Sequence, residues 1–316
     1  MARFTLRQLE YLVACVEHRS VAAAAERLNV SQPTISVAIA KMEARLGVQL
    51  LLRHHAQGVT PTRSAENILP SARSLLAHAS DLERQAMQAG TGVAGELKLG
   101  SLVTIAPAIL PRLVRGLTGT YPELRLTLQE ATQEDTLAAL FEGRLDLALL
   151  YDLSLPEGLR AVPLTGLPPY VALPEGHGLC AQDEIALEAL VDEPLILLDL
   201  PTSREYFLGL FDKAGLSPRI AHTSPSVELV RGMVGQGLGY SILATRPESD
   251  VTYDGRRIVV RALKDGGPPT RIMLVSLASL RQTRLMGCVE DVAVAVFSQD
   301  PPPRIRSGAG RAGSKG

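Results

Sequence analysis

Side chains that can read the edges of DNA bases cluster near the N-terminus, in the segment SVAAAAERLNVSQPTISVAIAKMEARLG from Ser20 to Gly47. Gln can hydrogen-bond adenine in the major groove, and Ser or Thr can bond either type of base. Long cations suit phosphates, which fix the register of a protein on DNA without reading its sequence. The candidate DNA-binding residues are Ser31, Gln32, Pro33, Thr34, Ser36, Val37, Lys41 and Arg53.

The elements that must position these residues are two short helices joined by a tight turn and packed on an earlier helix over Leu6–Glu17. Ser20 and Ser31 are suited to cap helix N-termini, and Asn29 between them suits a left-handed turn. The apolar residues after Ser31 recur at helical spacing, which places them on one face and small or polar residues on the other. The inner set is Ile35, Ile39, Met42 and Leu46, and the outer set is Pro33, Val37, Ala40 and Ala44. This layout predicts a helix-turn-helix whose second helix enters the major groove.

The charge distribution agrees with a DNA-binding head on a separate body. The 316 residues carry 32 Lys plus Arg and 33 Asp plus Glu, but residues 1–63 hold 8 and 4, a net charge of +4, whereas residues 64–300 hold 20 and 29, a net charge of −9. A basic head suggests a polyanionic partner. The alternative interpretation is a plain helical hairpin with capping serines, which serves only for oligomerisation.

A repeat of seven residues follows the head. Ala65, Ala72, Ala79 and Ala86 share one position of the repeat, and Ile68, Leu75, Leu82 and Ala89 lie three residues after each. Such a seam predicts a helix over residues 64–89 that pairs with its copy in a second subunit. The alternative is an amphipathic helix packed on its own domain. The Gly-rich run AGTGVAG then predicts a hinge, and the Pro-, Gly- and Arg-rich residues 299–316 predict a disordered basic tail.

Beyond the hinge, strand and helix signals alternate, which predicts an α/β body of two lobes. The predicted limits are 4–62 for the head, 63–92 for the linker helix and hinge, and 93–298 for the body. Within the body, one lobe takes residues 93–162 and 264–298, and the other takes residues 163–263. The second lobe contains the strand Leu195–Asp199 and helices that begin near Ser203 and Ser226.

Polar residues begin several helices of the body, where ligands of open α/β sheets bind. Each hydroxyl is also suited to cap its helix, and Thr202 with Glu205 forms a capping-box pattern, so the structural role and the binding role stay open. Free N–H groups at helix starts favour a carboxylate or another anion, and Arg204 would add a bidentate partner. The candidate effector-binding residues are Ser101, Thr104, Thr132, Gln133, Thr202, Ser203, Arg204 and Ser226.

The run LRQLEYLVACVEHRSVAAAAERLNVSQPTISVAIAKMEARLGVQLLLRHHAQGVTPT resembles the winged helix-turn-helix of LysR-type transcriptional regulators. The resemblance implies that Val21–Ala40 is the helix-turn-helix proper and that LLRHHAQGVTPT is a wing whose Arg53 meets the DNA backbone. One departure is Val37, which stands where the family usually carries Arg or another long polar side chain. An apolar contact with a thymine methyl group is one use for this side chain.

The body is similar to the periplasmic-binding-protein-like effector domain of the same family, and Thr104 matches a ligand-contacting Ser or Thr of that family. The resemblance implies a small-molecule effector that changes DNA bending and recruitment of RNA polymerase at a promoter. It also implies a homodimer joined through the linker helix, a homotetramer made of two such dimers, and a two-fold DNA site.

Other features narrow the function class. Three cysteines without metal-type spacing, no signal peptide and no membrane-length apolar run indicate a cytoplasmic protein with no metal or cofactor. Cys180 has only His177 nearby and no acidic partner, so the sequence does not favour an enzyme. GQGLGY, at Gly235–Tyr240, lacks the preceding strand of a dinucleotide site and predicts a helix end. The remaining alternative is a solute-binding or enzyme-like α/β protein.

Overall fold

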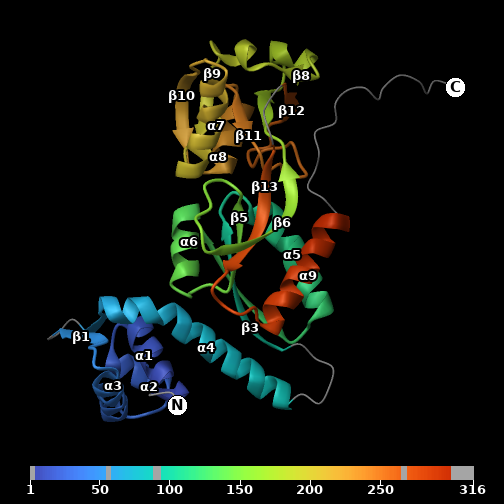
Figure 1. Cartoon of the computed structure of the whole chain (residues 1–316). Helices are drawn as coiled ribbons and strands as arrows, with labels where there is room; N and C mark the ends of the chain where they lie inside the picture. The colour runs from blue at the N-terminus through green and yellow to red at the C-terminus, as the bar shows by residue number, and fades with distance from the viewer. Residues whose placement is uncertain (1–3, 55–57, 88–93, 265–268, 300–316) are drawn as a thin grey trace.

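The computed structural model describes residues 4–54, 58–87, 94–264 and 269–299. They form an N-terminal head, a long helix that leaves it, and a body of two lobes stacked one above the other (Figure 1). The fold class predicted from the sequence, a winged helix-turn-helix, a linker helix and a two-lobed α/β domain, is therefore confirmed. Most of the predicted hinge and all but the first residue of the predicted tail lie outside the described residues.

The head consists of α1 (Leu6–His18), α2 (Val21–Arg27), α3 (Gln32–Leu46) and a hairpin of β1 (Leu51–His54) and β2 (Gly58–Pro61). The predicted caps are present, because the Ser20 hydroxyl accepts from the Ala23 N–H and the Ser31 hydroxyl accepts from the Thr34 N–H. Asn29 takes the predicted left-handed conformation at φ 52°. Ile35, Ile39 and Met42 are buried as predicted, and Leu46 packs at the edge of the same core.

The hairpin is fixed to the helices by backbone contacts. The Val59 N–H donates to the Arg19 carbonyl at 3.0 Å, and one Glu43 carboxylate oxygen accepts from the Leu50 N–H at 2.7 Å and the Leu51 N–H at 3.1 Å. Gly58 has φ +87°, and a Cβ atom there would lie 2.1 Å from the Arg19 carbonyl oxygen. Only glycine fits this close approach, so the wing has a fixed position beside α3.

The linker helix α4 (Arg63–Met87) shows the packing on its own domain that was the alternative interpretation of the heptad repeat, and its pairing with a second subunit stays a prediction. Its first half packs on its own head, where Ala65, Leu69 and Ala72 are buried in the helical core. Its second half leaves the head, and there Leu75 is 43% exposed and Leu82 is 67% exposed. The head core is thus complete without these two leucines, which stay available for another surface.

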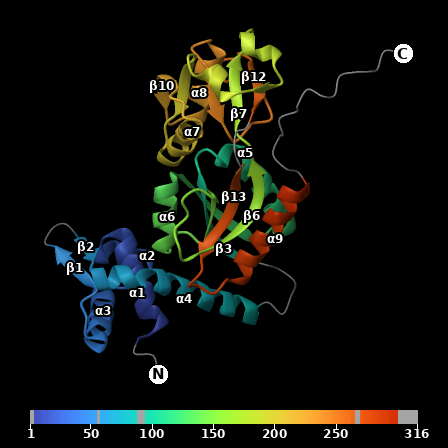
Figure 2. The same cartoon turned by 45° about the horizontal axis from the view of Figure 1, so that its top comes forward.

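The first lobe is a five-stranded sheet in the order β4-β3-β5-β13-β6. Its strands are β3 (Gly95–Leu102), β4 (Leu124–Ala131), β5 (Leu147–Tyr151), β6 (Leu159–Leu167) and β13 (Thr270–Leu277). On one face lie α5 (Ala106–Thr120) and α9 (Arg284–Gln299), and on the other lies α6 (Gln133–Phe141), as Figure 2 shows. The predicted alternation of strands and helices in this lobe is confirmed. Because β3, β4 and β5 are parallel, the starts of α5 and α6 meet at one edge of the sheet.

The second lobe pairs β9 (Pro194–Leu198) with β10 (Arg219–Ser224), and it has a second sheet in the order β11-β7-β12-β8, in which β8 pairs with β12. The strands of this second sheet are β7 (Tyr170–Pro174), β8 (Glu184–Ile185), β11 (Ser241–Leu243) and β12 (Ile258–Leu263). Strand β9 is also bridged to Tyr240 next to β11. Two helices, α7 (Pro201–Lys213) and α8 (Val227–Gly235), pack on β9. Short 3-10 turns occur at Gly178–Ala181 and Leu187–Leu190.

The boundary between the lobes differs from the predicted one. Strand β6 pairs antiparallel with β13 from Leu159 as far as Leu167, so residues 163–167 belong to the first lobe rather than the second. This pairing joins segments more than a hundred residues apart, and no local sequence pattern reports it. No helix in the described ranges is long and apolar enough to cross a membrane.

Candidate functional site

The outer face of α3 is exposed over the residues predicted to read DNA. Gln32, Pro33, Val37 and Lys41 are all exposed, with Val37 at 52%, and Ser36 is half-buried. The hydroxyls of Ser31 and Thr34 lie 2.7 Å apart, so each already has a partner at the start of the helix. The face therefore presents an amide, the apolar side chains of Pro33 and Val37 and an ammonium group to a surface that approaches α3, and Arg53 is exposed on the adjacent wing.

Five of the eight predicted effector residues meet in one place between the lobes. Thr104 precedes α5, Thr132 and Gln133 begin α6, and Thr202 and Ser203 lie in the first turn of α7. They line a cavity of about 40 Å³ together with Tyr151, the acidic Glu134 and apolar side chains. A neighbouring cavity of about 20 Å³ shares Thr104, Tyr151 and Ser203 and adds Tyr206 and Thr245. Cavities of this size hold only one to a few waters, so this part of the cleft is nearly filled. A larger cavity of about 690 Å³ lies beside it between the lobes, and its lining includes Asp152, Tyr206 and Arg271.

A chain of hydroxyl groups crosses from one lobe to the other inside this cleft. The Thr104 hydroxyl donates to the Tyr151 hydroxyl at 3.3 Å, and the Tyr151 hydroxyl lies 2.6 Å from that of Thr245 in the second lobe. The Tyr170 hydroxyl donates to the Thr245 carbonyl at 3.3 Å. Burial raises the pKa of Tyr151, so its phenol stays protonated and able to donate. We call the Thr104–Tyr151–Thr245 contacts the interlobe latch.

Two buried polar atoms at the cleft have no partner within the described residues. They are the Gln133 side-chain oxygen, which can accept, and the Tyr206 hydroxyl, which can donate. Burial is the main cause that raises the pKa of Tyr206 to about 12, and the nearby Asp152 charge adds to it, so this hydroxyl is also neutral. An unpaired buried polar atom costs about 1–3 kcal/mol. A ligand that pairs with both atoms would recover part of that cost.

The start of α7 differs from the predicted capping box. Pro201 occupies the first turn, so the cap position falls on Leu200, which has no side-chain acceptor, and Thr202 lies inside the helix instead of capping it. The N–H groups of Thr202 and Ser203 consequently have no cap from a side chain. Such an N-terminus favours an anion. At α6, by contrast, the Thr132 hydroxyl caps the Asp135 N–H, and the acidic Glu134 and Asp135 follow.

The other three predicted effector residues lie outside both cavities. Arg204 in the first turn of α7 forms an ion pair with Asp199, which follows β9 just before the helix, with its Nε 2.7 Å from the carboxylate. Ser226 is exposed and accepts from the Leu229 N–H, so it acts as the cap of α8. Ser101 is fully buried, and its hydroxyl donates to the Leu102 carbonyl. For these residues the structure shows the capping or pairing role.

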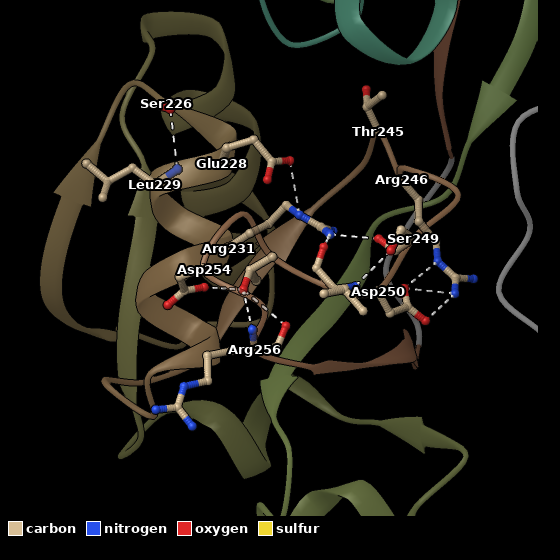
Figure 3. A network of polar contacts seen from close by, with 12 residues as sticks. Ser226, Glu228, Leu229, Arg231, Thr245, Arg246, Ser249, Asp250, Asp254 and Arg256 are labelled. Atoms are coloured by element: carbon tan, nitrogen blue, oxygen red, sulfur yellow. Dashed lines mark hydrogen bonds and ion pairs between the residues drawn. The ribbon is translucent and has the colours of Figure 1, made fainter.

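The segment that carries Thr245 is held by a buried arginine that the sequence did not single out. Arg231 on α8 is 1% exposed, and it donates to the Ser249 carbonyl at 2.7 Å and pairs with Glu228 at 3.2 Å (Figure 3). Arg246 pairs with Asp250 at 2.8 Å in the same segment. Tyr151 could have been found, since it ends a buried strand at the ligand edge of the sheet. Thr245 follows β11, a strand too short to show a pattern.

The cysteines take no part in the cleft. None of Cys15, Cys180 and Cys288 lines either cavity. Burial raises the pKa of Cys15 to about 11, and burial also raises the pKa of Cys180, so both thiols are poorer nucleophiles than a free cysteine. His177 accepts from the Leu179 N–H as the cap of a 3-10 turn rather than acting on Cys180. Among the described residues there is no cluster of three metal-ligating side chains.

Family comparisons agree with both parts of the chain. Residues 6–66 match the description "Bacterial regulatory helix-turn-helix protein, lysR family", and residues 90–298 match "LysR substrate binding domain". The chain is 32% identical to the "DNA-binding transcriptional dual regulator OxyR" of Escherichia coli over 91% of this chain and 98% of that protein. It is 35% identical to a "Hydrogen peroxide-inducible genes activator" of Pectobacterium carotovorum over 75% of this chain and 79% of that protein.

Solved structures show the same architecture over nearly the whole length. A full-length OxyR from Pseudomonas aeruginosa, carrying a cysteine substitution, matches with a TM-score of 0.76 and 28% identity over 96% of this chain and all of that one. HinK, a LysR-family transcriptional regulator from the same organism, matches with a TM-score of 0.62 and 37% identity over 93% of this chain and 99% of that one. These relatives are transcriptional regulators and not enzymes. The chain belongs to the LysR family of DNA-binding transcriptional regulators.

Proposed function

We propose that α3 reads DNA through Gln32, Val37 and the flanking polar side chains, while Lys41 and Arg53 contact phosphates. The observation that supports this most directly is the exposed outer face of α3 beside a fixed wing. Pro33 and Val37 give this face close apolar contact, and Ser31, Thr34 and Ser36 bond bases or phosphates beside it. At the position of Val37, an apolar contact would favour thymine, whose methyl group projects into the major groove.

We infer that the effector is a small molecule with a carboxylate or a similar anionic group, held without a covalent bond. The N–H groups at the start of α7 and the Thr104 and Ser203 hydroxyls would bond the anion. The unpaired Gln133 oxygen and Tyr206 hydroxyl would bond other polar atoms of the ligand. Arg204 and Ser226, which are occupied elsewhere, are left out of this proposal.

The names of several relatives, among them the Pectobacterium carotovorum protein, specify hydrogen peroxide. A peroxide-sensing cysteine is an exposed thiol of low pKa. This chain has no cysteine at the cleft, and burial raises the pKa of two of its three thiols. Hydrogen peroxide that oxidises a reactive thiol does not oxidise the Ser, Thr and Tyr hydroxyls that line the cleft. We therefore propose that the signal is ligand binding rather than oxidation of a thiol in the cleft.

Lobe movement follows from the small size of the two cavities beside the latch. A ligand larger than a few waters fits them only if the lobes separate, which breaks the contact of Tyr151 with Thr245. The ligand then takes over the bonds of the latch hydroxyls. The latch and the ligand thus compete for the same groups, and the balance between them sets the lobe angle.

Assembly follows from the linker helix. We propose a cytoplasmic homodimer that pairs through α4, with Leu75 and Leu82 at the contact. Two such dimers form a homotetramer on a promoter with a two-fold site, where the protein affects RNA polymerase. Two exposed leucines one heptad apart support the pairing. The homotetramer is proposed from the family resemblance alone.

The effector proposal is tested by thermal shift of the purified chain with a panel of small aliphatic and aromatic carboxylates and with hydrogen peroxide. We expect a carboxylate to raise Tm, and we expect Gln133→Leu and Ser203→Ala to abolish that rise. Asp212→Asn, a change at an exposed residue of α7 that lines none of these cavities, is the control. A Tm or DNA-binding response to peroxide that is lost when all three cysteines are replaced, or a carboxylate response unchanged in both variants, would contradict the proposal.

A further inference from the structure

One guanidinium on the linker helix contacts both the head and the body. Arg73 lies on α4, and its side chain is only 12% exposed. Its Nε is 3.4 Å from a carboxylate oxygen of Glu17 on α1 in the head. Its Nη1 donates to the carbonyl of Glu142, the residue that ends α6 in the first lobe. A buried arginine is stable only where its N–H groups are paired, so this position depends on both domains.

The backbones approach closely around this arginine. Gly143 follows α6 in the left-handed region at φ +66°, and a Cβ atom there would lie 3.0 Å from the Cα of Pro70 and 3.5 Å from the Cβ of Arg73. A second contact lies further along α4, where the His78 ring is 2.8 Å from the Arg281 carbonyl before α9. The end of α6 is therefore held against α4 by shape as well as by a hydrogen bond.

The other end of α6 lines the effector cleft. Helix α6 spans nine residues, a length of about 13 Å. Gln133 at its start carries the unpaired oxygen in the cleft, and Glu142 at its end accepts from Arg73. The carbonyl end of a helix carries a partial negative charge, which favours a cation. A short rigid helix thus connects the cleft to the linker helix.

We propose that Arg73 is the positioning residue that transmits movement of α6 to the reading head. A ligand that bonds to Gln133 and displaces it also moves the far end of α6. Because Arg73 contacts that end, the displacement is passed to α4 and, through Glu17, to α1. In a dimer joined by α4, the angle of each head sets the distance between the two reading helices and so the preferred spacing of the DNA half-sites. The inference rests on the proposed function of α3 and α4.

The test needs duplex DNA and no effector. Binding is measured to a single half-site and to a series of paired half-sites whose spacing changes by one base pair at a time. We expect the wild type to prefer one spacing, and Arg73→Ala to reduce that preference by about fivefold or more, a typical size for coupling between sites. Single half-site affinity should stay within about twofold, since no base or phosphate contact is removed.

A second variant reaches the same contact by another route. Gly143→Ala adds a methyl group against Pro70, so it should change the spacing profile in the same way as Arg73→Ala while each domain keeps its fold by circular dichroism. The controls are Arg115→Ala, an exposed arginine of α5, and Gly119→Ala, where a Cβ atom would meet nothing within 4 Å. Both should keep the wild-type profile.

The outcomes separate this inference from the proposed function. If wild type and controls bind paired half-sites with one preferred spacing, and both contact variants keep that spacing, the role of Arg73 is overturned. If a contact variant loses affinity for a single half-site as much as for paired half-sites, Arg73 is a general structural residue and the inference also fails. Absence of DNA binding by the wild type would instead overturn the proposed reading of DNA.

Discussion

Removing one oxygen atom, that of the Tyr151 hydroxyl, tests the interlobe latch. Tyr151 is 7% exposed, and Tyr151→Phe keeps the ring and its packing. The change leaves the Thr245 hydroxyl without its partner at 2.6 Å and the Thr104 hydroxyl without its partner at 3.3 Å. Because both groups are buried, water can replace the lost partners only in the small cavity beside them.

The expected magnitude follows from these two contacts. A typical hydrogen bond contributes a net 0.5–1.5 kcal/mol, roughly, and a buried group left unpaired costs about 1–3 kcal/mol. The longer Thr104 contact is weaker than the Thr245 contact. We therefore expect Tyr151→Phe to lower the free energy of unfolding by about 2 kcal/mol, with the larger part assigned to Thr245.

The measurement is urea unfolding followed by circular dichroism, with Tyr253→Phe as the matched control, since Tyr253 is 92% exposed and should show no change. A double-mutant cycle of Tyr151→Phe and Thr245→Val isolates the contact between lobes, and we expect a coupling energy of about 1 kcal/mol. If Tyr151→Phe is as stable as Tyr253→Phe, or if the two changes are simply additive, the latch does not hold the lobes together.

The pH dependence supplies an independent check. Burial raises the folded-state pKa of Tyr151 above its unfolded value of about 10. The protonated phenol is therefore favoured by folding, and its contribution is complete below pH 10 and declines as pH rises through the folded pKa. The stability difference between wild type and Tyr151→Phe should shrink above about pH 10; a difference that grows there would contradict the burial of this hydroxyl.

Three further predictions concern other parts of the chain. In competition gel shifts, Gln32→Ala should relax base preference. Lys41→Ala should weaken binding to all DNA sequences alike and reduce the slope of log affinity against log salt by about one unit. Equal losses of affinity for specific and random DNA in both variants would refute this assignment. Leu82→Asp should yield monomers in analytical ultracentrifugation, and unchanged dimers would remove the second half of α4 from the subunit contact. Arg160 lies 2.6 Å and 2.7 Å from the two carboxylate oxygens of Glu290 and is the main cause that lowers the pKa of Glu290. The stability advantage of wild type over Glu290→Gln should therefore be present above the unfolded pKa of about 4.3 and disappear as pH falls through the lower folded pKa. A stability advantage that persists in acid unfolding curves would argue against this pair.

The sequence predicts best where structure depends on neighbouring residues. Ser20, Asn29 and Ser31 act within a few positions of themselves, so the turn and both helices of the head were predictable from residue types. The first strands of the body follow the same logic, whereas the wing was implied by the family resemblance. Position 202 shows the limit of that logic, because Pro201 moved the cap to Leu200, and the apparent capping box did not form.

Features that depend on distant segments were not predictable. The extent of β6 is set by β13, more than a hundred residues later, and this pairing moved the lobe boundary. Likewise, Tyr151 meets Thr245 across the lobes, and Arg231 is buried only because the 245–251 segment folds over it. The predicted cleft residues converged where helix starts share one edge of the sheet. Arg204 and Ser226 did not join them, since a nearby carboxylate and a helix N-terminus occupied their polar groups.

The most direct test of the central proposal is a footprint of the purified chain on the DNA just upstream of its own gene, with wild type and Gln32→Ala compared at low and moderate salt. The account predicts protection of a two-fold site by wild type, with affinity that falls steeply as salt rises, and loss of that discrete site in Gln32→Ala. Protection by wild type and Gln32→Ala with the same boundaries and affinity would contradict the proposal that α3 reads the bases.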